Sequence, residues 1–124
     1  MKLILDTQVM LWWLLGDGRL RQETRERLAN TACLVSVASI WEVAIKHRLG
    51  KLPVKPIRFR DECLAAGAAL LGIRDTHVIE TGSLPGVHED PFDRLIIAQA
   101  RIEGLVAVSS DARWGDYGIA LQRP

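Results

Sequence analysis

The sequence predicts one α/β domain, with a central sheet of four or five mostly parallel strands and helices on both faces. Three largely apolar runs have the composition of short strands buried in a sheet, at residues 3–5, 33–37 and 105–109. Segments of helical length separate these runs, and strands that alternate with helices are typical of a parallel sheet. A chain of 124 residues is expected to form a single domain over residues 1–124.

Composition narrows the class of protein. Hydrophobic residues make up 48% and charged residues 25%, which is typical of a globular domain. A net charge of +1 excludes a strongly cationic, histone-like binder but leaves room for a local basic patch. Cys33 and Cys63 form no C-x-x-C pair, as expected of buried residues in a reducing compartment. No apolar run approaches the ~18 residues of a membrane span, and no signal peptide is apparent. We therefore expect a soluble, cytoplasmic protein.

Three helices are expected in the N-terminal half. The first is apolar at every position from Val9 to Leu15, which predicts burial on most of its circumference or cover by another subunit. The second has mixed charges, which favour a solvated face. Gly50 ends the third, and Pro53 and Pro56 are expected to keep the next segment extended. These helices are expected over residues 8–15, 20–30 and 39–49.

The C-terminal half contains the clearest helix, over residues 91–103. Asp90 can cap this helix, Pro91 suits its first position, and Gly104 ends it. A helix rich in Ala and Leu is expected earlier in the chain, over residues 61–71. The remaining expected elements are a short strand over 72–74, helical turns over 76–82, a loop over 84–87, a turn over 114–117 and an edge strand over 119–121.

Four acids fall at strand ends or helix starts. Asp6 follows the first strand, Asp111 follows the strand over 105–109, and Glu42 and Asp93 are expected in first helical turns. Ligands of open α/β sheets bind at the carboxyl ends of the strands. Acids crowded there repel each other unless a cation neutralises them, and magnesium prefers such oxygen ligands. The four acids therefore predict a site for a divalent metal ion.

A purely structural interpretation of these acids stays open. Asp6 and Asp111 suit N-cap positions, and Glu42 stands at capping-box spacing from Ser39. Asp93 would complement a helix dipole. Other chemistries fit less well, because the histidines lack zinc-finger spacing and neither a G-x-S-x-G elbow nor a phosphate-binding glycine loop is present.

A series of motifs runs in order through nearly the whole chain. They are L-D-T at 5–7, S-V-A-S-I-W-E-V-A-I-K at 36–46, R-L-G-K-L at 48–52, L-P at 84–85, His88, D-P-F-D-R-L-I-I-A-Q-A at 90–100 and V-S-S-D at 108–111. Together they resemble the PIN-domain endoribonucleases, specifically the VapC-type toxins of prokaryotic toxin–antitoxin pairs. Two positions depart from the family pattern: Gln8 stands where relatives often have His, and Glu89 where they often have Arg.

The resemblance implies a PIN fold and a magnesium- or manganese-dependent ribonuclease, inhibited by a cognate antitoxin and assembled as a homodimer. The family's acidic quartet falls on Asp6, Glu42, Asp93 and Asp111, and Asp90 matches a further acid. The substrate is expected to be RNA in single-stranded form or in a structured loop. The alternative is a PIN-fold binding or regulatory module without nuclease activity.

Further residues receive supporting roles. The hydroxyls of Thr7, Ser109 and Ser110 are expected to orient ligands or water. No acid occurs over residues 43–60, and we expect the cations Lys46, Arg48 and Lys51 to contact the RNA backbone; a solvated helix end is the alternative. The apolar residues Met10, Trp12, Trp13 and Trp41 are expected either to belong to the core or to meet a second subunit or an antitoxin helix.

Overall fold

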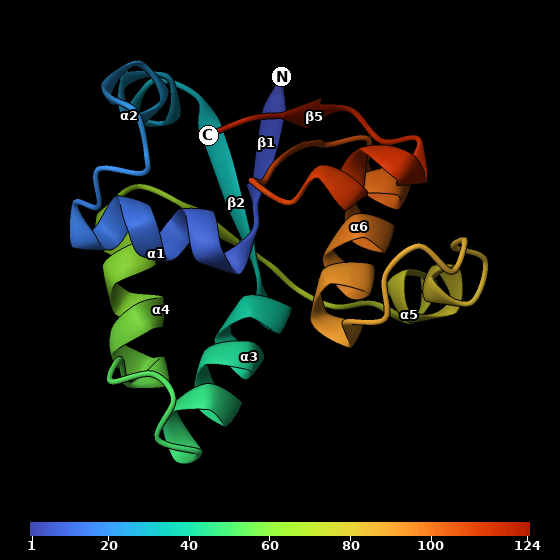
Figure 1. Cartoon of the computed structure of the whole chain (residues 1–124), viewed down its shortest axis with the longest axis horizontal. Coiled ribbons are helices and arrows are strands. Elements are labelled where there is room, and N and C mark those ends of the chain that lie inside the picture. Colours follow the sequence, from blue (N-terminus) through green and yellow to red (C-terminus); the bar gives the residue numbers. More distant parts are fainter.

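Five parallel strands form the central sheet, in the order β3-β2-β1-β4-β5 (Figure 1). The computed structural model describes residues 1–124. The central strand β1 (Lys2–Leu5) pairs with β2 (Ala32–Ser36) on one side and β4 (Val106–Val108) on the other. The edges are β3 (Ala69–Leu71) and β5 (Leu121–Gln122). The predicted α/β class and parallel sheet are confirmed, and every strand pair is parallel.

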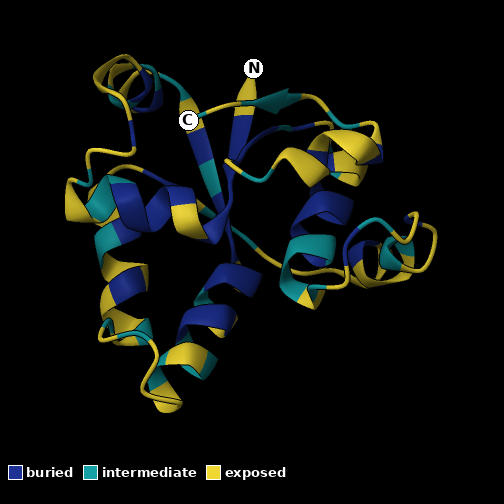
Figure 2. Ribbon diagram, in the orientation of Figure 1, coloured by how far each residue is buried: buried dark blue, intermediate teal, exposed yellow.

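The apolar run of β1 supplies both hydrophobic cores. Successive side chains of a strand point to opposite faces of the sheet. Leu3 and Leu5 belong to one core, whereas Ile4 belongs to the other, and all three are fully buried. Figure 2 shows buried residues gathered along the strands and the helix faces that cover them. A strand buried on both faces is therefore apolar at every position, which is why no alternation marks it in the sequence.

Helices cover both faces of the sheet (Figure 1). The first core packs against residues of α1, α2, α3 and α4, while the second packs mainly against α6 and the 3₁₀ helix η1. None of the helices is long and apolar enough to cross a membrane. The helices are α1 (Thr7–Leu15), α2 (Gln22–Ala29), α3 (Val37–Arg48), α4 (Pro56–Ala65), α5 (Asp75–Thr81), α6 (Pro91–Glu103) and η1 (Ala112–Tyr117).

The segment around α4 differs from its prediction. The helix was expected over 61–71 but spans Pro56–Ala65, because Pro56 starts the helix rather than keeping the chain extended. Proline suits this first position, where its missing N–H is not needed. Gly67 then takes a φ of +96°, which ends the helical segment, and the strand forms at Ala69–Leu71 instead of over 72–74. The other boundaries lie within about two residues of prediction, as is usual for helix and strand ends.

The predicted capping box of Ser39 and Glu42 is wrong. The N-cap of α3 is Ser36, whose hydroxyl oxygen accepts a hydrogen bond from the N–H of Ala38. The helix therefore begins earlier, and Glu42 lies in its second turn, where it caps nothing. Ser39 is buried, and its Oγ accepts a hydrogen bond of 2.8 Å from the Thr7 hydroxyl. This contact ties the first turn of α1 to α3.

Candidate functional site

One cavity of about 480 Å³ collects the predicted acids. It lies at the carboxyl end of the central strands, where α1, α3, α6 and η1 converge. Its lining includes all four predicted ligands: Asp6, Glu42, Asp93 and Asp111. In total six acidic and three basic side chains line the cavity, so without a bound cation it repels anions.

Asp6 is both an N-cap and a member of the site. Its Oδ1 accepts the N–H of Val9 at 2.7 Å, and its Oδ2 accepts the Ser109 hydroxyl at 2.5 Å. Burial raises the pKa of this carboxyl from 3.8 to about 6, against the lowering effect of these two hydrogen bonds. The neighbouring charges of Asp93 and Glu42 raise the pKa further. Asp6 is therefore held in place by donors while it is pushed toward its neutral form.

Opposing effects also act on the pKa of Asp93, which lies in the first turn of α6. Burial raises its pKa, the charge of Asp90 raises it further, and His88 lowers it. Asp90 caps α6 by accepting the N–H groups of Phe92 at 2.9 Å and Asp93 at 3.1 Å, so its predicted capping role holds. Trp114 also lies beside Asp93, with its indole Nε1 donating to Oδ2 at 3.4 Å.

Glu42 has one paired and one unpaired carboxylate oxygen. Its Oε2 accepts a hydrogen bond of 2.7 Å from the Lys46 ammonium, while its Oε1 is buried without any partner. An unpaired buried carboxylate oxygen is costly, and native structures rarely leave one without a reason. A cation bound in the cavity would supply the missing partner.

Asp111 is the most exposed of the four acids, and it is paired with a cation, Arg113. Hydrogen bonds from Arg113, at 3.0 and 2.8 Å, lower its pKa to about 2, and burial opposes this effect. The Ser109 hydroxyl also accepts the N–H of Asp111 at 3.1 Å while donating to Asp6. Ser109 therefore connects two of the acids, whereas Ser110 only lines the cavity and Thr7 directs its hydroxyl to Ser39.

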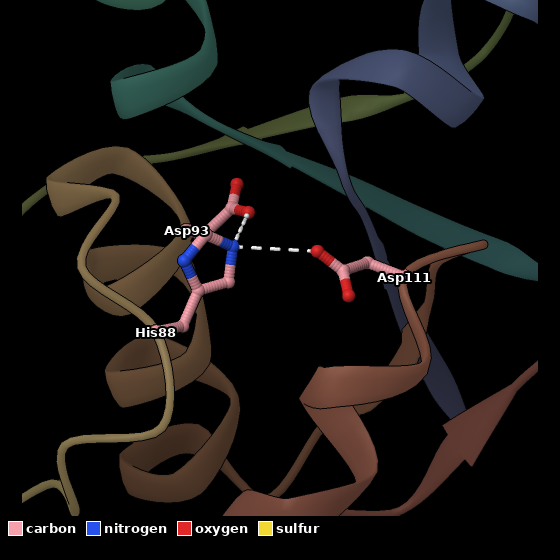
Figure 3. A group of neighbouring side chains, drawn as sticks. All are labelled: His88, Asp93 and Asp111. Carbon is pink, nitrogen blue, oxygen red and sulfur yellow. Dashed lines mark ion pairs between the residues drawn. The ribbon is translucent and has the colours of Figure 1, made fainter.

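His88 is a further residue of the site that the sequence analysis does not assign (Figure 3). It is 7% exposed, and its Nε2 lies 2.8 Å from Asp93 Oδ2 and 3.3 Å from Asp111 Oδ2. Neither carboxylate aligns with Nε2 for a hydrogen bond. Ligand atoms of these three residues lie within 4.8 Å of one another, a spacing suited to one metal ion, and Asp6 and Glu42 fall outside this tight group.

The tautomer of His88 follows from its other ring nitrogen. Nδ1 accepts the N–H of Asp90 at 3.1 Å, so a neutral His88 carries its proton on Nε2, toward the two carboxylates. His88 lies in an irregular loop, where no periodicity points to a site. The family resemblance includes His88 among the matching residues but assigns it no role, and its position two residues before the helix cap Asp90 is the local signal for one.

A family model described as the PIN domain matches residues 3–120. The chain belongs to the PIN domain family. No curated protein matches it. Solved structures show the same fold over almost the whole chain. VapBC2 from Rickettsia felis, bound to a DNA fragment of its promoter, has a TM-score of 0.74 at 16% identity, with 99% of this chain and 98% of that chain covered. DNA-bound VapBC from Salmonella typhimurium has a TM-score of 0.72 at 20% identity, over 99% and 98%.

A third solved structure is VapC20 from Mycobacterium tuberculosis, described as a toxin that cleaves the sarcin–ricin loop. It has a TM-score of 0.67 at 19% identity, with 98% of this chain and 99% of that chain covered. At such identities the likeness shows the PIN fold. The expected family and the single PIN domain are thus confirmed.

Arg94 fixes the loop of the PIN domain that carries His88. Its Nη1 donates to the carbonyls of Pro85 at 2.8 Å and His88 at 3.2 Å, and its Nη2 to those of Thr81 at 2.8 Å and Leu84 at 3.2 Å. Four carbonyls held by one planar guanidinium give an irregular loop a defined shape. Arg94 follows Asp93 in α6, so the loop and the acid share one support.

The basic segment of the PIN domain, residues 43–60, contains no acid, but acids from elsewhere in the fold pair with several of its cations. Lys46 and Lys51 line the cavity, but Lys46 is paired with Glu42. Arg48 is exposed and lies outside the cavity lining. Two further cations of the segment meet acids of α4: Arg58 pairs with Glu62 and Arg60 with Asp61. Lys51 is therefore the cation of the cavity wall without a carboxylate partner.

The raised pKa of Asp6 predicts a stabilising substitution. An acid with a raised folded-state pKa favours folding while protonated, and this contribution is lost as pH rises from about 4 to about 6. Asp6→Asn removes the charge and keeps an oxygen for capping. In excess chelator at pH 7, we expect the variant to unfold with a free energy about 1–3 kcal/mol higher than wild type. Urea unfolding measures this difference, which should vanish below pH 4; a less stable variant at pH 7 would contradict the prediction.

Proposed function

We propose that this PIN domain is a divalent-metal-dependent endoribonuclease, a VapC-type toxin that hydrolyses RNA in single-stranded regions or structured loops. PIN domains are nucleases, and one neighbour in fold is described as an RNA-cleaving toxin. The observation that carries the proposal is the buried, unpaired Oε1 of Glu42 in a cavity with five further acids. Because Glu42 caps no helix, the structural interpretation of the acids does not account for it.

The residues present fit magnesium or manganese. The cavity offers hard carboxylate oxygens from Asp6, Glu42, Asp93 and Asp111. Burial is the main cause of the raised pKa values of Asp6 and Asp93, and neighbouring acids raise them further, a repulsion that a cation would relieve. When bound, a divalent ion neutralises phosphate oxygens and lowers the pKa of water. His88 turns its Nε2–H edge toward Asp93 and Asp111, so its proposed role is to orient these carboxylates.

The residues of the chain then share the remaining tasks. Ser109 holds Asp6 and the backbone of Asp111, which fixes two acids before the substrate arrives. We propose that Lys46, Arg48 and Lys51 contact the RNA backbone near the cavity, with Lys51 the cation free of carboxylates. The histidines form no acid–base pair, since the His47 ring bonds to the Leu52 carbonyl and His77 is buried beside Glu103. Water is therefore the proposed nucleophile, rather than the 2′-hydroxyl of the RNA.

The proposal predicts that cleavage depends on a divalent cation. Wild-type protein should cleave RNA with magnesium and lose this activity in excess chelator. Asp93→Asn should be inactive but folded. Magnesium should raise the stability of wild type by about 2.7 kcal/mol at a concentration 100 times its Kd, and should act much less on Glu42→Gln. Thermal unfolding and cleavage of total RNA measure the two effects.

The ends of the fragments provide the control for this prediction. Attack by water that expels the 3′-oxygen leaves a 5′-phosphate on one fragment and a 3′-hydroxyl on the other. Mass spectrometry of the fragments identifies these ends. Undiminished cleavage in excess chelator, or a 2′,3′-cyclic phosphate as the main product, would contradict the proposal.

Two apolar surfaces are proposed to bind protein partners. Met10 and Trp12 are buried in the core and so are not available, but Leu15 is 66% exposed at the end of α1. A groove of about 180 Å³ lies between α1 and α4, lined by apolar residues that include Leu14 and Phe59. We propose that an antitoxin helix occupies this groove. Trp41, 54% exposed and packed edge-to-face on Phe92 at 4.9 Å, is the proposed contact with a second copy.

The groove proposal is tested by a charge at its exposed rim. Leu15→Asp should not unfold the protein, because the side chain is exposed, but it should reduce copurification with an antitoxin expressed from the same operon. Ile79→Asp is the matched control, since Ile79 is 71% exposed on α5, outside the groove. Equal copurification of both variants with the antitoxin would place the antitoxin elsewhere.

A further inference from the structure

The cavity extends from the acids to a second group of side chains at the far end of α1. Its lining there includes Trp12, Leu15, Asp17 and Arg19. A helix rises about 1.5 Å per residue, so Trp12 lies about 9 Å along the axis from Asp6. The volume of about 480 Å³ falls within the range of small-ligand sites, roughly 300–1,000 Å³. The mechanism proposed above leaves this end of the cavity unused.

Two neighbouring side chains, Trp12 and Asp17, fix the Arg19 guanidinium at this end of the cavity. Its guanidinium carbon lies over the Trp12 ring, 5.0 Å from the ring centroid. Its Nε and Nη2 donate to Asp17 Oδ1 at 3.1 Å and Oδ2 at 2.7 Å, and its backbone N–H donates to Oδ1 at 2.9 Å. Trp12 itself is only 8% exposed and packs in the first core. Arg19 is thus fixed along one edge by Asp17 and beneath by Trp12.

This arrangement determines what Arg19 can bind. Its charge is already matched by Asp17, whose pKa is lowered to about 2, mainly by the hydrogen bond from Arg19. A guanidinium whose donors already face a carboxylate is a weak ligand for a further phosphate. The side chain is nevertheless 67% exposed, so a ligand can still reach the guanidinium group. Guanidinium planes stack on unpaired nucleobases.

We propose that Arg19, held on Trp12 by Asp17, is a stacking platform for one nucleobase of the RNA substrate. The base would lie at the opposite end of the cavity from the acids, so that binding it brings a neighbouring phosphate toward Asp6 and Asp93. The proposal rests on the proposed function in taking RNA as the ligand. Stacking does not read base edges, so the platform favours an unpaired base over a paired one without selecting a sequence.

The test compares two ligands that differ only by a base and cannot be cleaved. Adenosine 5′-monophosphate and ribose 5-phosphate carry the same phosphate, so the ratio of their affinities isolates the contribution of the base. In the wild type with magnesium, we expect the nucleotide to bind about tenfold more tightly, as one stacked base contributes. NMR titration of the Trp12 indole and Arg19 Nε resonances measures both affinities.

Substitutions at Arg19 separate stacking from charge. Arg19→Lys keeps the charge but loses the plane, so the affinity ratio should fall toward one in Arg19→Lys and Arg19→Ala alike. Arg60→Ala is the matched control, because Arg60 also donates through Nε and Nη2 to an aspartate, Asp61, yet lies outside the cavity. Its ratio should stay at the wild-type value.

The outcomes distinguish this proposal from the proposed function. A wild-type ratio near one, or a nucleotide that shifts neither resonance up to its solubility limit, would overturn the platform even if magnesium-dependent cleavage were found. A ratio unchanged in Arg19→Lys and Arg19→Ala would also overturn it. Conversely, an affinity ratio of about ten in a protein that cleaves no RNA would contradict the proposed nuclease activity but support the base-binding platform.

Discussion

Electrostatic repulsion among buried carboxylates is the constraint on which the site depends. Burial raises the pKa values of Asp6 and Asp93 most, and the charge of Glu42 raises both further, while the charge of Asp93 also raises that of Asp6. The fold opposes this repulsion with specific donors: Ser109 and the Val9 N–H for Asp6, Lys46 for Glu42, and Arg113 for Asp111. These contacts keep the acids in place, but only Lys46 and Arg113 bring a compensating charge, and the donors to Asp6 are neutral. The protein accepts an electrostatic cost in its free state that a cation would remove.

The sheet makes this arrangement rigid. Asp6 is the first residue after a strand whose side chains are buried in both cores, and its own N–H donates to the Val108 carbonyl of β4 at 3.1 Å. Asp93 belongs to a helix whose inward face is part of the second core. Acids that depart from such elements cannot move apart to relieve their repulsion, because any shift would disturb close packing. The rigid packing therefore both holds the acids ready for a cation and keeps them close enough to repel each other when no cation is bound.

The sequence predicts some of these elements better than others, for physical reasons. The strand before Asp6 and the helix after Asp90 were predictable, because burial and capping leave local patterns of apolar runs, Pro91 and Gly104. The start of α4 was not, since Pro56 suits both an extended segment and a first helical turn, and only packing decides. The depth of Glu42 in α3 depended on Ser36 capping in place of Ser39. His88 and its clamp by Arg94 depend on hydrogen bonds to loop carbonyls, which carry no periodic signal.

The parallel order of the strands has a consequence for protein synthesis. Asp6 and Ser109, which share a hydrogen bond, are separated by 103 positions, and β1 pairs with β4 as well as with β2. A ribosome releases the chain from its N-terminus, so a nascent chain exposes Asp6 and Glu42 long before Asp93 and Asp111 emerge. Until then the central strand lacks one neighbour and the cavity lacks one wall. An assembled site therefore exists only after Asp111 has emerged, and a partner translated beforehand has time to be present when the site forms.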